Sequence, residues 1–340
     1  MRKLASRTNL RLCPRQTVMR WILPVLSTAL IAVGTCVAFS RSLTRARARL
    51  AGRSDMVEAS FGAMEYAVMG EGEPVLSIHG AAGSFDQTLD MTGALAGRGY
   101  RLIAPSRFGY LRTSMPDHPT VAMQADAYAE LLDRLGVHGA VVVGISAGAW
   151  SYLQFAIRHP GRCKALVLLV PASALPKGVR IRGGALARAI FNSDFVAWAA
   201  LRLTPTLPGA MTKMMLGTDS AVLRKAEPSE KARVRQILDH LPPVSRRIAG
   251  MNFDVATAAA LESCPLEKIA CPVLTISAED DTFGTARQAR SIAAGVPDGR
   301  AIIFPTGGHA MAGRHADALR EITSFLQAMS PACRLEEQSV

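Results

Sequence analysis

A serine between two glycines is the residue best suited to chemistry. The pentapeptide GISAG at 144–148 follows an apolar run typical of a buried strand and leads into a helical pattern. At such a strand–turn–helix junction the serine hydroxyl is exposed, and small residues two positions before and after it let strand and helix approach closely. We therefore interpret Gly144 and Gly148 as parts of a nucleophile elbow and Ser146 as a nucleophile for acyl carbons.

A serine nucleophile needs a base, and the base needs an acid that orients it. Among the seven histidines, His309 has the most suitable setting. It follows the apolar run 301–304 through a glycine-containing loop and comes before the last helical pattern. We predict His309 as the base, with His315, at the start of that helix, as the alternative.

The orienting acid is predicted in an acidic loop. Glu279, Asp280 and Asp281 come one residue after the apolar run 272–277, which has the composition of a strand. A carboxylate in a loop at the end of this strand can reach the far nitrogen of the histidine. We predict Asp280 as the orienting acid, and Asp281 and Glu279 are the alternatives.

A fourth element is the sequence HGAAG at 79–83, which follows a short apolar strand pattern. Small residues here let backbone N–H groups face a reacting carbonyl, so the N–H groups of Ala81 and Ala147 are the predicted oxyanion hole. His79 is expected to brace this loop. The scheme requires no cofactor, and the six cysteines show no CxxC spacing, so we expect neither a cofactor nor a bound metal.

The elements that must position these residues alternate between strands and helices from residue 55 onward. This alternation predicts an α/β fold with a mostly parallel, doubly wound sheet. The alternation stops between Pro171 and Leu261, where helical pieces are broken by proline and glycine. We therefore predict a core formed by residues 54–171 and 262–340, with residues 172–261 inserted as a helical cap over one end of the sheet.

The net charge of +12 first suggests a nucleic-acid-binding protein. Eleven of the 39 basic residues lie in residues 1–53, however, which contain no acid. The remainder holds 28 basic and 27 acidic residues and is therefore nearly neutral. A nucleic-acid partner is not expected.

The basic residues of the N-terminal segment flank an uncharged apolar run at 21–40. Twenty helical residues span about 30 Å, the thickness of the hydrocarbon core of a membrane. The run is longer than the apolar part of a signal peptide, which favours a retained single-pass membrane anchor. The alternative is export after cleavage near the small-residue triplet at 38–40. In an exported protein, Cys264 and Cys271 could form a disulfide.

Taken together, the motifs resemble those of the α/β-hydrolase fold superfamily over residues 55–330. This resemblance implies an eight-stranded sheet with a cap inserted after the sixth strand. A serine at position 146 separates the chain from relatives with an aspartate nucleophile, such as haloalkane dehalogenases and epoxide hydrolases. The HG loop also lacks the HGxGPG form of carbon–carbon bond hydrolases. The motifs occur in the family's order: HG at 79–80, RFGY at 107–110, GISAG at 144–148, EDD at 279–281 and GGH at 307–309.

The expected function is a membrane-anchored serine hydrolase that cleaves a carboxylic ester, or a related acyl bond, of a small apolar substrate. Its acyl-enzyme would form on Ser146, with His309 as base and Asp280 as orienting acid. One alternative is a non-catalytic ligand-binding or scaffold protein on the same fold. Another is an acyltransferase or perhydrolase that uses the same three residues.

Overall fold

The computed structural model describes residues 14–172, 190–203, 208–260 and 264–329. The chain divides into two units, residues 1–45 and residues 46–340. This boundary lies eight residues before the predicted one. The reason is that Ala46 is buried and Leu50 packs against the core of the second unit.

The second unit is built on one eight-stranded sheet with the strand order β1-β2-β4-β3-β5-β6-β7-β8. β1 pairs antiparallel with β2, and β2 with β4, whereas the remaining neighbours run parallel. The predicted α/β fold with a mostly parallel sheet is therefore confirmed. The strands are β1 (Asp55–Ala59), β2 (Gly62–Met69), β3 (Glu73–Ile78), β4 (Tyr100–Pro105), β5 (Ala140–Ile145), β6 (Cys163–Leu169), β7 (Val273–Ala278) and β8 (Gly299–Phe304).

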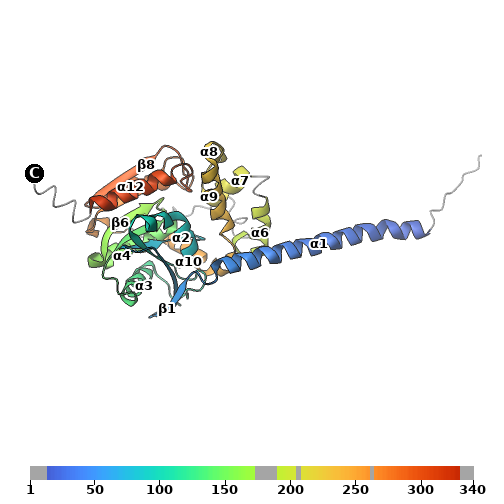
Figure 1. Cartoon of the computed structure of the whole chain (residues 1–340), viewed down its shortest axis with the longest axis horizontal. Coiled ribbons are helices and arrows are strands. Elements are labelled where there is room, and N and C mark those ends of the chain that lie inside the picture. The colour runs from blue at the N-terminus through green and yellow to red at the C-terminus, as the bar shows by residue number, and fades with distance from the viewer. Residues whose placement is uncertain (1–13, 173–189, 204–207, 261–263, 330–340) are drawn as a thin grey trace, which may run out of the picture. The chain divides into compact units, whose positions relative to one another are not determined.

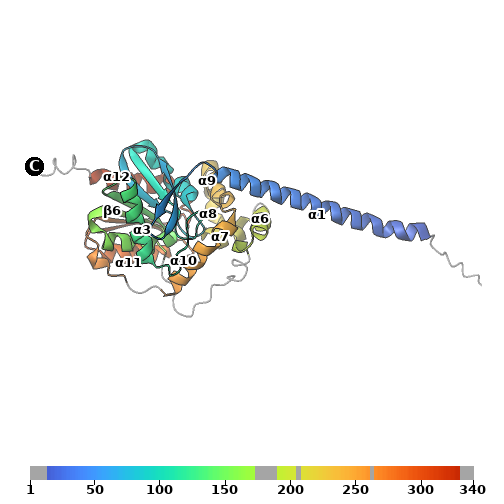
Figure 2. The ribbon, with the colours of Figure 1, turned by 90° about the horizontal axis from the view of Figure 1, so that it is seen from below.

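Helices cover both faces of the sheet, as Figures 1 and 2 show from two sides. Side chains of α2 and α12 share one apolar core with the sheet, and side chains of α3, α4 and α11 share the other. Burial on both faces explains why the central strands are continuous apolar runs. The helices are α2 (Phe85–Thr92), α3 (Val121–Arg134), α4 (Ala149–Arg158), α11 (Thr285–Gly295) and α12 (His315–Ala328).

The parallel strands bring four loops to one edge of the sheet. β3, β5, β7 and β8 all end there, and their register aligns Ile78 with Gly144 and Ala278 with Phe304. The segments that follow these strands contain the HG loop, the GISAG turn, the acidic loop and the GGH loop. Open α/β sheets bind their ligands at this edge.

The described residues between β6 and β7 form helices and no strand, as expected of a helical insertion. The predicted end of the insertion, Leu261, lies outside the described residues. α10 is the longest of these helices and packs on the loops described below. The elements are α6 (Asp194–Arg202), α7 (Pro208–Leu216), α8 (Ser220–Lys225), α9 (Pro228–Asp239), η4 (Val244–Arg246), α10 (Ile248–Ala260) and η5 (Leu266–Lys268).

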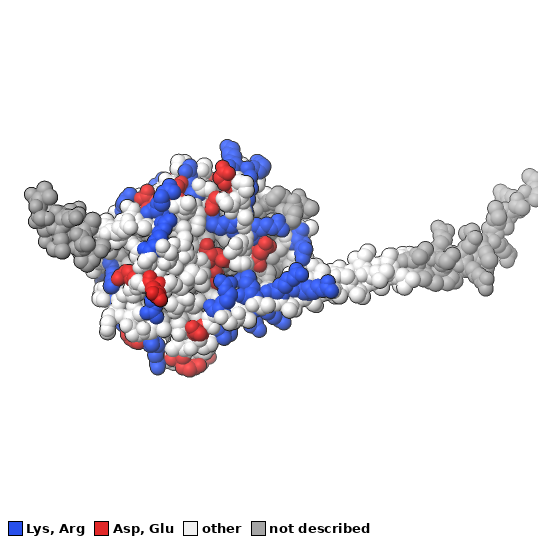
Figure 3. Space-filling model, in the orientation of Figure 1, with Lys and Arg blue, Asp and Glu red and all other residues white. Residues whose placement is uncertain are grey.

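Helix α1 (Pro14–Leu50) contains the predicted apolar run. Its stretch Pro24–Leu50 contains an 18-residue window with a mean hydropathy of 1.5 and is long and apolar enough to cross a membrane, a test that signal sequences also pass. Apolar side chains such as Leu30 and Ile31 are about 70% exposed along it. Figure 3 shows part of this helix without charged side chains, and basic side chains toward its C-terminal end.

The cysteines do not adopt the pairing considered from the sequence. The Sγ atom of Cys271 lies 3.5 Å from that of Cys163, because Cys163 begins β6 and Cys271 lies two residues before the neighbouring strand β7. The Sγ atom of Cys264 instead lies 4.0 Å from the side-chain amide of Gln154. All three are free thiols.

Candidate active site

Ser146 lies at the turn that joins β5 to α4. Its φ of 51° is in the left-handed region, which a residue with a Cβ atom adopts only under strain. A 3-10 turn at Ser146–Gly148 follows and leads directly into α4. The predicted strand–turn–helix geometry is therefore present, with the serine at its tip.

The two glycines of the turn are required by close packing. A Cβ atom on Gly144 would lie 1.9 Å from the ring of Tyr152, and one on Gly148 would lie 2.7 Å from the carbonyl oxygen of His79. Both distances are far below contact distance. The glycines thus let α4 and the HG loop approach β5.

His309 lies in the loop after β8 and points at the serine. Its Nε2 atom is 2.9 Å from Ser146 Oγ, a hydrogen-bonding distance. The imidazole side chain is only 15% exposed, and the ring of Phe283 packs edge-on against it at 4.9 Å. The structure therefore joins the two residues that the sequence analysis assigned as nucleophile and base.

The acid beside the histidine is Asp281, and the prediction of Asp280 is wrong. His309 Nδ1 lies 2.8 Å from Asp281 Oδ2. The fully buried carboxylate also accepts hydrogen bonds from the Phe283 N–H, at 2.8 Å, and from the Thr285 hydroxyl. These donors compensate for burying a charged group and fix its orientation.

Asp280 has a different contact. Its Oδ1 accepts a hydrogen bond of 2.8 Å from the backbone N–H of Gly308, the residue before the histidine. Asp280 therefore holds the loop, whereas Asp281 contacts the ring. Glu279, the third candidate, is turned outward into an exposed ion pair with Arg290.

Two further histidines are engaged elsewhere. His79 donates from Nδ1 to the carbonyl oxygen of Gly80 at 2.7 Å and accepts the Arg107 N–H on Nε2 at 2.9 Å. Burial and the nearby Arg107 lower the pKa of His79 well below its usual value, so the ring is neutral and braces the loop. His315 Nε2 contacts the carbonyl oxygen of Met91, so this residue is not the base at Ser146.

The HG loop passes beside the nucleophile. A Cβ atom on Gly80 would lie 2.9 Å from the Cβ atom of Ser146. The next N–H, that of Ala81, has no hydrogen-bond partner among the described residues. Ala147 is the second residue of its 3-10 turn, where an N–H has no partner within the helix. Both groups are therefore available donors.

A buried ion pair that the sequence analysis missed ties α10 to the HG loop. Arg107 forms two hydrogen bonds with Asp254 of α10, at 2.7 and 2.6 Å, and a third with the carbonyl oxygen of Gly80 at 3.2 Å. Tyr110 donates to the same carboxylate and accepts the N–H of Ala82. An acidic residue in the middle of the apolar segment MNFDVATAAA was the available signal.

A second buried cluster holds the other end of this loop. Arg247, which is fully buried, donates to the carbonyl oxygens of Ala82 and Gly83 and pairs with Asp86. Arg49 reaches the same carboxylate from the last turn of α1. The two arginines lower the pKa of Asp86, although burial alone would raise it. The loop is thus fixed from both sides by buried charges.

The described residues contain no group of three or more His, Cys, Asp or Glu side chains that could hold a metal ion. The hydrogen-bonded series at the site consists of Ser146, His309 and Asp281. These residues come from three different loops at one edge of the sheet.

A doubly wound sheet with a strained serine at a strand–helix turn, and a histidine and an acid at the same edge, is the arrangement of the α/β hydrolases. The chain belongs to this family: the model of the alpha/beta hydrolase fold matches residues 73–315. The resemblance noted from the sequence motifs is therefore confirmed.

Relatives and solved structures agree with this assignment. The chain is 29% identical over 237 residues to the uncharacterized hydrolase YcgS of Bacillus subtilis, covering 67% of this chain and 82% of that protein. It is 24% identical over 268 residues to the 2-hydroxy-6-oxo-6-phenylhexa-2,4-dienoate hydrolase of Burkholderia cepacia, covering 75% and 87%. The alpha/beta hydrolase fold protein from Nakamurella multipartita has a TM-score of 0.67 at 24% identity, covering 82% of this chain and all of that one.

Proposed function

We propose that the protein is a serine hydrolase that cleaves a carboxylic ester or a related acyl bond. The observation that carries this proposal is the pair of contacts made by His309, at 2.9 Å to Ser146 Oγ and 2.8 Å to Asp281 Oδ2. This series allows one ring nitrogen to take the serine proton while the other is held by a carboxylate.

In the proposed reaction, Ser146 Oγ attacks the carbonyl carbon and its proton moves to His309 Nε2. The tetrahedral intermediate then collapses, and the leaving alcohol takes the proton from Nε2. Water attacks the resulting acyl-enzyme with the same nitrogen as base, and the free acid leaves. The buried Asp281 carboxylate keeps Nδ1 protonated and stabilises the imidazolium in both halves.

The N–H groups of Ala81 and Ala147 are proposed to bind the developing oxyanion. Loss of one such donor typically costs about 3–4 kcal/mol of transition-state stabilisation. The buried pairs Arg107–Asp254 and Arg247–Asp86 support this role, because they immobilise the loop that carries Ala81. A fixed donor does not have to be reoriented during the reaction.

We further propose that α1 anchors this enzyme in a membrane. The hydroxyls of Ser27 and Thr28 bond to the Pro24 carbonyl, and that of Thr35 bonds to Ile31, so these polar groups are satisfied within the helix. Cleavage near residues 38–40 is the alternative. The intact mass of the protein purified from its membrane fraction distinguishes an anchor from a removed signal.

Ester hydrolysis by the full chain in detergent tests the reaction. Wild-type protein should release p-nitrophenol from an acyl ester series, and Ser146→Ala should lose at least about 10³-fold in kcat while retaining the fold. Well-folded wild-type protein that hydrolyses no member of the series faster than Ser146→Ala does contradicts the proposal.

Product analysis separates the related reactions of this fold. A hydrolase gives mainly free acid in the presence of a competing alcohol, whereas an acyltransferase gives a new ester. Assay with 2-hydroxy-6-oxo-6-phenylhexa-2,4-dienoate tests the hydrolysis named for the Burkholderia cepacia relative. Because the loop here reads HGAAG, we expect no activity on that substrate.

A further inference from the structure

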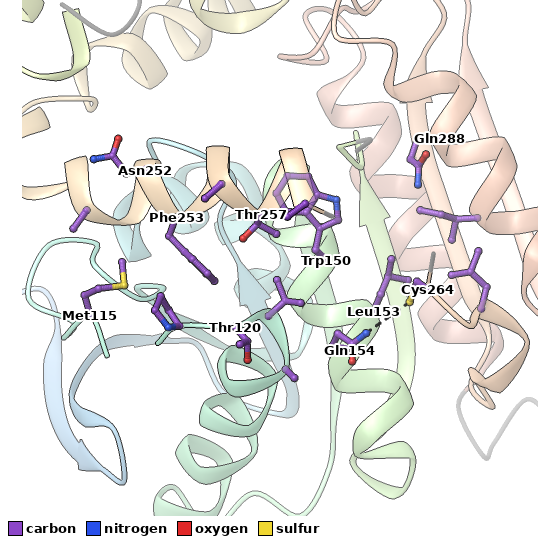
Figure 4. A pocket seen from close by; sticks show the side chains of 18 residues that line it. Met115, Thr120, Trp150, Leu153, Gln154, Asn252, Phe253, Thr257, Cys264 and Gln288 are labelled. Atoms are coloured by element: carbon purple, nitrogen blue, oxygen red, sulfur yellow. Dashed lines mark hydrogen bonds between the residues drawn. The ribbon is translucent and has the colours of Figure 1, made fainter. Parts of the chain in front are cut away.

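A long groove lies on the side of α10 that faces α3 and α4. Its volume is about 1070 Å³, at the upper end of the roughly 300–1,000 Å³ typical of ligand sites. Figure 4 shows Phe253 and Thr257 projecting from α10 toward α3 and α4, with Trp150 between these helices. Lining residues on α10 run from Ala249 to Ala260, which corresponds to about 16 Å of helix.

The lining of the groove is uncharged. Twelve of its 18 residues are apolar and the other six are neutral polar residues; none is acidic or basic. The apolar side chains include Met115, Val121, Leu153, Phe253 and Ile292, contributed by several elements. An ionised ligand would be desolvated here without a counter-charge, so the lining favours a neutral, elongated apolar molecule.

One polar group of the lining lacks a partner. The Trp150 side chain is 94% buried, and its Nε1 atom has no hydrogen-bond partner among the described residues. A buried indole N–H usually donates a hydrogen bond, and an unsatisfied donor costs free energy. The lining thus holds one buried donor without a partner, and a ligand that carries an acceptor can pair with it by displacing the atoms that cover it.

The groove does not belong to the site around Ser146. None of Ser146, His309, Asp281, Ala81 or Ala147 lines it. Helix α10 separates two environments, because Asp254 on its buried side contacts Arg107 while Ala256 and Thr257 face the groove. Occupation of the groove therefore needs no acyl transfer to the serine.

We infer that the groove is a second binding site, for a neutral long-chain molecule whose single polar group accepts a hydrogen bond from Trp150. A fatty alcohol or an uncharged fatty acyl ester has this chemistry. The chain lies along α10 among the apolar side chains, and the hydroxyl or carbonyl oxygen pairs with the indole N–H. This site is additional to the proposed catalytic function.

Binding is measured by fluorescence quenching with a brominated octadecanol, which contains no acyl bond that the protein could cleave. In a full chain carrying Trp21→Phe and Trp198→Phe, Trp150 is the sole tryptophan. Saturable quenching is expected. Each methylene added to a short-chain alcohol should tighten binding about fourfold until the chain fills the groove. Brominated octadecane, which has no acceptor, should bind about 2- to 10-fold more weakly.

Two exposed alanines on α10 provide a matched pair of variants. Ala256 lines the groove and Ala259 does not, although they are three residues apart on one helix. In the sole-tryptophan protein, Ala256→Phe should weaken octadecanol binding at least tenfold, whereas Ala259→Phe should leave it unchanged.

Two results overturn the inference. One is equal quenching in the Ala256→Phe and Ala259→Phe proteins, which locates the ligand elsewhere. The other is tighter binding of a brominated octadecylamine than of the alcohol, which contradicts a site for neutral molecules. Neither binding measurement involves turnover. Both can therefore be interpreted even if the proposed ester hydrolysis is not observed.

Discussion

His309 contacts Asp281 and not Asp280. The 2.8 Å contact between Nδ1 and Oδ2 joins the ring to a fully buried carboxylate, while the adjacent Asp280 accepts the N–H of Gly308. Two neighbouring acids of one loop therefore have separate tasks. One orients the imidazole and the other holds the backbone that carries it.

This division predicts different effects of two adjacent substitutions. Asp281→Asn should lower kcat for ester hydrolysis by about 10³–10⁴-fold, because an amide cannot stabilise the imidazolium and favours the wrong tautomer. Asp280→Asn keeps an oxygen that can accept the Gly308 N–H and should lower kcat less than tenfold. Steady-state kinetics of both proteins tests the assignment. A larger loss in Asp280→Asn would reverse it.

The close packing of the turn around Ser146 predicts that a side chain at position 144 destabilises the folded protein. A Cβ atom there meets the Tyr152 ring at 1.9 Å, so Gly144→Ala should lower the free energy of unfolding by about 1–3 kcal/mol. Gly161→Ala is the control, because a Cβ atom at that position meets nothing within 4 Å. Chemical denaturation compares them, and equal stabilities would show that the turn tolerates the added atom.

The cluster around Asp86 predicts that Arg49, which itself belongs to the second unit, stabilises that unit. Arg49→Ala removes one of two arginines from a carboxylate with no exposed surface. The expected cost is about 1–3 kcal/mol of unfolding free energy, since Arg247 remains. Arg47→Ala, at an exposed position two residues away, should change the stability by less than about 0.5 kcal/mol. Indistinguishable denaturation curves would contradict a role for Arg49.

The lowered pKa of His79 predicts a dependence of stability on pH. Below pH 6.5 the unfolded chain protonates this histidine, whereas the folded chain keeps it neutral. The unfolded state then binds more protons, so stability falls as the pH falls, by up to about 1.4 kcal/mol per pH unit. His79→Gln should show a shallower decrease between pH 6.5 and 5.5. Parallel curves for the two proteins would mean that His79 titrates normally in the folded state.

Most of the fold could be predicted from the sequence, because buried parallel strands appear as continuous apolar runs that are easy to recognise. The apolar runs 272–277 and 301–304 lie within two residues of β7 and β8, and the GISAG turn joins a strand to a helix as predicted. Helix α2 was not predicted, because its eight residues are too few for a helical period to stand out. The boundary between the two units, at residues 45 and 46, depends on the packing of Leu50 against residues that are distant in the sequence. No local sequence pattern indicates this packing.

The candidate site was only partly predictable for a similar reason. Ser146 and His309 each have a local sequence context that favours one role, and His315 was the one alternative to His309. The three acids at 279–281 share one context, and the direction of each side chain in a tight turn decides which one reaches the ring. Asp254 lies 147 residues from its partner Arg107, so their pairing required the folded structure.

Labelling with a fluorophosphonate tests the central claim most directly, because the reagent reacts with an activated serine and stops at a stable adduct. The full-length protein should gain one adduct per chain, which peptide mass mapping assigns to Ser146, and His309→Ala should label far more slowly. A well-folded wild-type protein that gains no adduct, or that gains it on another serine, would contradict a nucleophilic Ser146.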